Sequence, residues 1–160
     1  MDANTFFIVS RLAHVSSSLP LSVMRLRCSK GVSVNPTAIF GNFHIRSSDL
    51  LALPVIDSDK GFAFSLKVEE NLTTIRRVSF QVALLYTSSN HERRIRILNK
   101  CLPVSASLAD VFRTANAEVL GDLLFKAAGK RAIEQRLAQA REGIFNVTAD
   151  ILKTYKAAFR

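Results

Sequence analysis

Residues 78–104, VSFQVALLYTSSNHERRIRILNKCLPV, decide the fold. In the first half of this stretch apolar residues alternate with small or polar ones, a period of two that places the apolar side chains on one face of a strand. The polar residues 87–90 (TSSN) predict a tight turn. The second half alternates too, with Ile95 and Ile97 on one face and Arg94, Arg96 and Leu98 on the other. We therefore expect a long β-hairpin, and it needs a partner layer because two strands alone are marginally stable in water.

Three stretches before the hairpin have the pattern of strands. Residues 23–28 (VMRLRC) separate an apolar face from a face that carries Arg25 and Arg27. Residues 62–68 (FAFSLKV) alternate in the same way, and residues 38–46 (AIFGNFHIR) are a further strand candidate in which Gly41 predicts a bulge or a close approach. Strands with one apolar face are typical of antiparallel sheets, which bury one side and expose the other. These segments supply candidates for the layer that covers the hairpin.

Other parts of the N-terminal region are expected to lack regular structure. Residues 1–22 predict an irregular leader, because their apolar block is short and is followed by a run of serines. Pro36 is expected to break the chain between two strand candidates, since proline cannot donate to a β-ladder. Residues 50–53 (LLAL), which Pro54 follows, predict a short apolar turn.

After residue 104 the apolar period changes from that of a strand to that of a helix. Ser105 or Ser107 is suited to cap a first short helix. A second helix is expected to begin near Ala115 and to end at Gly129. A third helix is predicted from one apolar stripe in steps of three and four, which consists of Ile133, Leu137, Ala140, Ile144, Val147, Ile151 and Tyr155.

The predicted fold class is α+β, since a run of strands is followed by a run of helices. Residues 23–104 are expected to form part of an antiparallel β-sandwich, and residues 105–160 an all-α segment. Neither part is expected to close on its own, because the strands supply one sheet and an incomplete second one. The last helical stripe has no later segment to face it. The sequence therefore resembles a piece of a larger multidomain protein.

The charge of the chain favours anionic partners. Its 160 residues carry a formal net charge of +9, which suits acidic peptides, acidic lipid head groups or nucleic acid. Binding of single-stranded nucleic acid would require aromatic side chains among the basic ones, and none lies within the basic run 92–96 (ERRIR). A basic nucleic-acid-binding or other interaction module remains the alternative to the function inferred below.

Catalytic and metal-binding patterns are missing from the sequence. The histidines, His14, His44 and His91, have no Cys, Asp or Glu nearby at the spacing of metal ligands. Cys28 and Cys101 form no CxxC pair, so we expect free thiols that pack as small apolar residues in a reducing compartment. No phosphate-binding glycine loop or nucleophile elbow is present. The chain is therefore not expected to be an enzyme.

Two groups of arginines are the candidate functional residues. Arg25 and Arg27 lie two positions apart on one strand face, which suits bidentate binding of an acidic peptide. The alternative is that they are solvated or paired within the molecule. Arg93, Arg94 and Arg96 form the second group, and we interpret them as partners in ion pairs within the sheet or between domains rather than as a ligand site.

Four segments together resemble the cargo-selecting adaptor subunit of the COPII vesicle coat. They are VMRLRCSKG (23–31), GNFHIRSSDLLALP (41–54), the hairpin sequence 78–103 and SLADVF (107–112). The resemblance covers residues 23–160 and leaves out the leader. It implies the later part of that family's β-sandwich domain and the first part of its helical domain. The family's zinc finger, trunk and gelsolin-like domains lie outside this sequence, so no cofactor is expected here.

The resemblance also implies partners and a place in the cell. The family's adaptor pairs with a sister coat subunit, reads export signals in cargo proteins and lies against the acidic cytosolic surface of the endoplasmic reticulum. It acts in transport from there to the Golgi on COPII vesicles, as a peripheral cytoplasmic protein. One of the family's cargo sites receives an acidic-ended peptide on arginines, and Arg25 and Arg27 match it best in this sequence. The second arginine group, Arg93, Arg94 and Arg96, keeps its structural interpretation.

Overall fold

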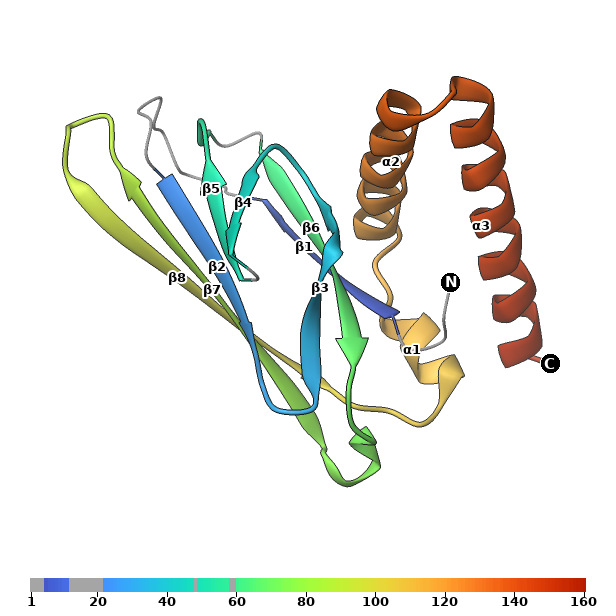
Figure 1. Cartoon of the computed structure of the whole chain (residues 1–160). Helices are drawn as coiled ribbons and strands as arrows, with labels where there is room; N and C mark the ends of the chain where they lie inside the picture. The colour runs from blue at the N-terminus through green and yellow to red at the C-terminus, as the bar shows by residue number, and fades with distance from the viewer. Residues whose placement is uncertain (1–4, 12–21, 48, 58–59) are drawn as a thin grey trace. The chain divides into compact units, whose positions relative to one another are not determined.

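The chain folds into two compact units, a β unit that ends at Val104 and a helical unit, Ser105–Arg160. The computed structural model describes residues 5–11, 22–47, 49–57 and 60–160 (Figure 1). Strands come first in the sequence and helices follow. This order confirms the prediction of an α+β chain with antiparallel sheets.

Within the described residues, the β unit contains eight strands in two antiparallel sheets. A three-stranded sheet has the order β1-β6-β3, and a five-stranded sheet has the order β4-β5-β2-β7-β8. A short 3₁₀ turn, Leu72–Thr74, precedes β7. The strands are β1 (Thr5–Arg11), β2 (Ser22–Cys28), β3 (Val32–Phe40), β4 (His44–Ser47), β5 (Leu50–Leu53), β6 (Gly61–Val68), β7 (Arg77–Thr87) and β8 (Arg93–Pro103).

One hydrophobic core joins the two sheets, which Figure 1 shows as two layers of strands. The smaller sheet contributes Phe62, Phe64 and Leu66 from β6, all buried. The larger sheet contributes buried side chains from three strands: Met24, Leu26, Leu51, Leu53, Val78, Phe80, Val82, Leu84 and Tyr86. Alternate residues of β2 and β7 point away from this core, as the period of two predicts. These alternate side chains make up the outer face of the five-stranded sheet.

The long hairpin is confirmed, and its register assigns a face to every side chain of β8. Residues 88–92 connect the strands, and His91 takes a positive φ of 61° in that turn. Arg94 and Arg96 lie opposite the buried residues Tyr86 and Leu84. They therefore share the core side of the sheet, while Ile95 and Ile97 point outward and are 67% and 54% exposed. Leu98 and Leu102, which share the core side of β8, are 39% and 38% exposed, so β8 is only partly covered.

Three expectations for the β unit are wrong. Residues 5–11 of the supposed irregular leader form β1, which pairs with β6. Pro36 does not break the chain but lies within β3, at a register shift between Val34 and Ile39 where ladder bonds are interrupted anyway. Residues 50–53 form β5 instead of a turn, because pairing with β2 satisfies their backbone. Gly41 joins β3 to β4 at a φ of +143°, which side chains disfavour.

The helical unit contains α1 (Leu108–Thr114), α2 (Ala117–Glu134) and α3 (Leu137–Ala158). Ser107 caps α1 by accepting from the Asp110 amide at 3.4 Å, and Asn116 caps α2 by accepting from the Glu118 amide at 2.9 Å. Phe112 of α1 meets Tyr155 of α3 edge-to-face, with ring centroids 5.5 Å apart. These contacts hold the first and third helices together.

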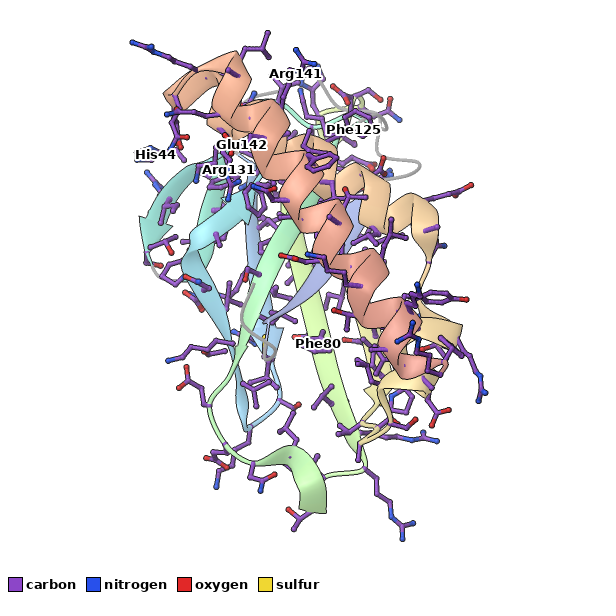
Figure 2. All side chains as sticks on the ribbon, turned by 90° about the vertical axis from the view of Figure 1, so that its right-hand side faces the viewer. His44, Phe80, Phe125, Arg131, Arg141 and Glu142 are labelled. Carbon is purple, nitrogen blue, oxygen red and sulfur yellow. The ribbon has the colours of Figure 1, made fainter. Side chains whose placement is uncertain are left out.

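The second helix runs past its expected end. Gly129 lies inside α2, where a Cβ would have no atom within 4 Å, so nothing forces a break there. Ile133 consequently belongs to α2 and is 87% exposed, outside the stripe predicted for α3. Ala140 of that stripe is buried. Figure 2 shows Arg131 of α2 close to Glu142 of α3, and the Arg131 guanidinium packs on α3 at Gly143.

Candidate functional site

The outer face of β2 presents the first arginine pair. Met24 and Leu26 are buried in the core, so the alternating Arg25 and Arg27 point to the opposite side of the sheet. Their separation along the strand is about 7 Å, as for any two residues of a strand at positions i and i+2. The structure thus brings both guanidinium groups to one face but gives them different surroundings.

Arg25 is engaged within the molecule. Its Nε lies 2.9 Å from Asp49 Oδ2, and its Nη2 donates to Asp49 Oδ1 at 3.4 Å. The Nε contact is an ion pair without hydrogen-bond alignment. Asp49 immediately precedes β5, the strand that pairs with β2, so sheet formation itself brings the two side chains together. Arg25 therefore has an internal partner, the alternative left open by the sequence.

Arg27 is exposed and makes no ion pair with any side chain in the described part of the chain. It borders a shallow hollow of about 490 Å³ on the five-stranded sheet. The side chains across this hollow follow the strand register, since Arg27 pairs with Gln81 and Gln81 pairs with Asn99. Gln81 Nε2 donates to Asn99 Oδ1 at 3.0 Å, and this hydrogen bond orients the two amide side chains that line the hollow. Lys100 also borders the hollow, but it lies opposite the buried Phe80, so its side chain leaves the other face of the sheet.

The hollow can therefore receive a carboxylate. The Arg27 guanidinium lies at its margin beside the amide side chains of Gln81 and Asn99, and its lining contains no acidic residue. Charge-assisted hydrogen bonds from guanidinium and ammonium groups to a carboxylate are stronger than neutral ones. The sequence pattern identified Arg27 but missed Gln81 and Asn99. The hairpin register was the signal that could have found them, because it places Gln81 opposite Asn99.

The two cysteines border the same hollow and remain free thiols. Burial raises the pKa of the Cys28 thiol to about 11, so it stays protonated at neutral pH. Cys101 is exposed, which corrects the expectation that both cysteines pack as buried residues. Their Cβ atoms leave opposite faces of the sheet, because Cys28 aligns with Phe80 and Cys101 with Ser79. The fold therefore keeps the thiols apart.

The second arginine group is spread over two faces of β8. Arg93 Nη1 donates to Thr87 Oγ1 at 3.0 Å across the end of the hairpin. Arg94 Nε donates to Glu92 Oε2 at 3.0 Å, and this hydrogen bond is the main cause that raises the pKa of Arg94. Arg96 is half-buried on the core side beside Leu84. These two hydrogen bonds lie within the hairpin itself.

Other kinds of site find no support in the described residues. No three His, Cys, Asp or Glu side chains there gather closely enough to hold a metal ion. His44 is exposed on β4 and His91 lies in the hairpin turn, while His14 falls outside the described residues. None of the helices in this part of the chain combines the length and hydropathy needed to cross a bilayer.

Comparisons with known proteins agree with this architecture. The family model of the Sec23/Sec24 beta-sandwich domain matches residues 21–105. Human protein transport protein Sec24A is 45% identical over 137 residues, which cover 86% of this chain and 12% of that protein. Arabidopsis thaliana protein transport protein SEC24 A is 42% identical over 135 residues, or 84% of this chain and 13% of its own length.

A solved structure extends the similarity to three dimensions. The crystal structure of the human COPII-coat protein Sec24c matches with a TM-score of 0.76 and 28% sequence identity, and the match covers 87% of this chain and 19% of that one. The chain thus spans only a small part of its relatives' length. Because the domain model covers more than half of the 160 residues, the chain belongs to the Sec23/Sec24 family.

Proposed function

We propose that the chain serves as part of a COPII coat adaptor that selects cargo for transport from the endoplasmic reticulum to the Golgi. The observation that carries this proposal is the 45% identity to human protein transport protein Sec24A over 137 residues. An alignment of that length is longer than the β unit and reaches into the helical unit. The sequence similarity therefore extends beyond the β-sandwich domain and includes the connection from the last strand to the helices.

The partners follow from the same family. They are a sister coat subunit, the export-signal peptides of cargo proteins and the acidic cytosolic surface of the endoplasmic reticulum. A net charge of +9 supports attraction to acidic head groups. The role is binding and assembly as a peripheral cytoplasmic protein, without a reaction of its own.

Arg25 and Arg27 are the residues that we propose bind an acidic-ended export signal, and they contribute unequally to its affinity. Arg27 is exposed beside the amide side chains of Gln81 and Asn99 and is available to a peptide carboxylate. Arg25 already neutralises Asp49 and contributes mainly by fixing the β2 surface. Arg93, Arg94 and Arg96 keep their proposed role in pairing within the sheet or between domains.

A binding measurement with the whole chain tests this site. The probe is a fluorescein-labelled ten-residue peptide that ends in two acidic residues, followed by fluorescence anisotropy. Arg27→Ala should weaken binding about tenfold, the loss expected for one charge-assisted hydrogen bond. Arg25→Ala should weaken it less, and Arg141→Ala on α3 is the matched control for the loss of one exposed arginine. Equal affinities of wild type and the Arg25→Ala/Arg27→Ala double variant would refute the site.

The same measurement separates the adaptor from the nucleic-acid-binding alternative. A single-stranded oligonucleotide that binds more tightly than the peptide, with affinity falling steeply as salt rises, would favour the alternative. The adaptor predicts that the peptide binds at physiological salt and that the oligonucleotide competes only at low ionic strength.

A further inference from the structure

The long edge of the five-stranded sheet is the feature that the proposed function leaves unused. β8 has 11 residues and pairs with β7 and with no other strand in the described part of the chain. Two other sheet edges are blunted, since β4 has four residues and β3 carries Pro36 and a register shift, and the remaining edge, β1, has only seven residues. Short strands, proline and bulges are the usual devices that prevent edge pairing. β8 has length and regular pairing instead.

The direction of the backbone groups on β8 follows from two hydrogen bonds at the ends of the hairpin. Ser88 N donates to Glu92 O at 2.8 Å, and Val104 N donates to Arg76 O at 3.0 Å. In an antiparallel ladder every second residue pair is hydrogen-bonded. The bonded residues of β8 between these ends are therefore those facing the even positions of β7, such as Arg96 opposite Leu84.

The residues in between direct their N–H and C=O groups to the open edge. These residues are Ile95, Ile97, Asn99 and Cys101. Each is exposed, so an incoming strand meets no covering side chain there. The edge offers donors and acceptors at the repeat that another antiparallel or parallel strand requires.

The side chains of β8 select the chemistry of that strand. Arg93, Arg94, Arg96 and Lys100 give the strand four positive charges, and it contains no acidic residue. Arg94, Arg96 and Lys100 share one face, while Ile95 and Ile97 share the other. A fitting strand carries Asp or Glu on the first face and β-branched apolar residues on the second, because opposite charges and apolar pairs stabilise cross-strand neighbours.

We propose that β8 binds an extended acidic segment of a partner protein as an added strand, hydrogen-bonded to the backbone of Ile95, Ile97 and Asn99. A second copy of this chain is a poor occupant, since two β8 edges would place like charges on adjacent strands. Arg27 belongs to β2, and the hollow beside it shares Asn99, Lys100 and Cys101 with β8, so the two surfaces adjoin.

Amide hydrogen exchange on the whole chain, followed by NMR, tests the proposal. The probe is a ten-residue peptide in which glutamate alternates with valine, acetylated and amidated at its ends. Saturating peptide should slow exchange about tenfold or more at Ile95, Ile97 and Asn99, whose N–H groups gain a partner. Exchange at Arg96 and Leu98 should change far less, because their N–H groups already bond to β7.

Matched probes and variants exclude other modes of binding. A peptide with N-methylated valines keeps the charge but cannot complete the ladder, and it should not bind. Arg96→Glu should weaken binding about tenfold, whereas Arg141→Ala, which removes an exposed arginine of α3, should leave it unchanged. Ile97→Pro removes an outward N–H and spares the β7 ladder, so it should abolish binding while the circular dichroism spectrum stays that of wild type. If Ile97→Pro perturbs the fold, the N-methylated peptide and the Arg96→Glu variant still test whether the peptide binds as an added strand.

Several results would overturn the proposal. No slowing at Ile95, Ile97 and Asn99 under saturating peptide would exclude strand addition. Equal binding of the N-methylated peptide would show attraction by charge alone. Displacement of the peptide by an equimolar oligothymidylate, without protection of these amides, would mark β8 as a general polyanion surface.

Discussion

Replacing Asp49 with Asn should weaken the fold slightly and strengthen the binding of an acidic peptide. The substitution removes the carboxylate that holds Arg25 and nearly preserves the size of the side chain. Arg25 then joins Arg27 as a second available guanidinium on the same face of β2. The two effects have opposite signs, so the change separates a structural role of this ion pair from a role in binding.

Both magnitudes follow from the geometry of the pair. The side chains of Arg25 and Asp49 are 38% and 41% exposed, so solvent screens the ion pair and its loss should cost only about 0.5–1 kcal/mol. For the ligand, a negative charge is removed at a distance of about 7 Å from a carboxylate seated on Arg27. At the dielectric constant of water this repulsion is about 0.6 kcal/mol, or about a threefold gain in affinity.

Urea denaturation and peptide anisotropy measure the two effects on the same samples. Asp150→Asn is the matched control, because it removes a similar exposed carboxylate that pairs with Lys153 on α3 and changes the net charge by the same amount. It should leave the peptide affinity close to that of wild type. If Asp49→Asn fails to raise the affinity, or if Asp150→Asn raises it equally, the local interpretation of Arg25 is wrong.

Three further predictions concern the fold. At pH 8 a disulfide reagent should modify Cys101 quickly and Cys28 only after unfolding, since burial raises the pKa of Cys28 to about 11. Gly41→Ala should destabilise the β unit by about 1–3 kcal/mol, because residue 41 has a positive φ. Gly129→Ala should stabilise α2 by up to about 1 kcal/mol, because alanine is the better helix former. Hydrogen exchange measures both changes. Hydrogen bonding by Ser33 and the charge of Lys67 lower the pKa of Glu69 below its unfolded value of 4.5. The ionised Glu69 therefore stabilises the fold above pH 4.5, and this stabilisation is lost as the pH falls through the folded pKa. Glu69→Gln should therefore reduce the loss of stability on acidification, measured by urea titration at several pH values.

The hairpin was predictable because its pattern is unbroken. Val78 to Tyr86 alternate without a glycine or proline, so both the strand and its buried face follow from the sequence. The helix after Asn116 was predictable from apolar periodicity, but its end was not. Gly129 has the local signature of a stop, and α2 passes through it because continued hydrogen bonding costs little at a site without close neighbours.

Features that depend on long-range pairing were not predictable. The residues around Pro36 predict that a strand ends there, yet a register shift on the edge strand β3 accommodates the proline. The partner of Arg25 is Asp49, and only the pairing of β2 with β5 brings them into contact. The candidate hollow shows the same limit, since Asn99 of β8 and Arg27 of β2 line it together only because β7 lies between their strands. The sequence indicates chemical types along one strand, and the sheet order decides which of them meet.

The position of β2 between β5 and β7 has a consequence for how the chain folds. Val23 pairs with Leu85, so their separation is 85 − 23 = 62 residues. Closing such long loops is entropically costly, and folds dominated by non-local pairs form slowly. During synthesis at about 5–20 residues per second, β2 waits several seconds for β7 to appear. The β7–β8 hairpin, which needs only a five-residue connection, is then the natural template on which the earlier strand docks.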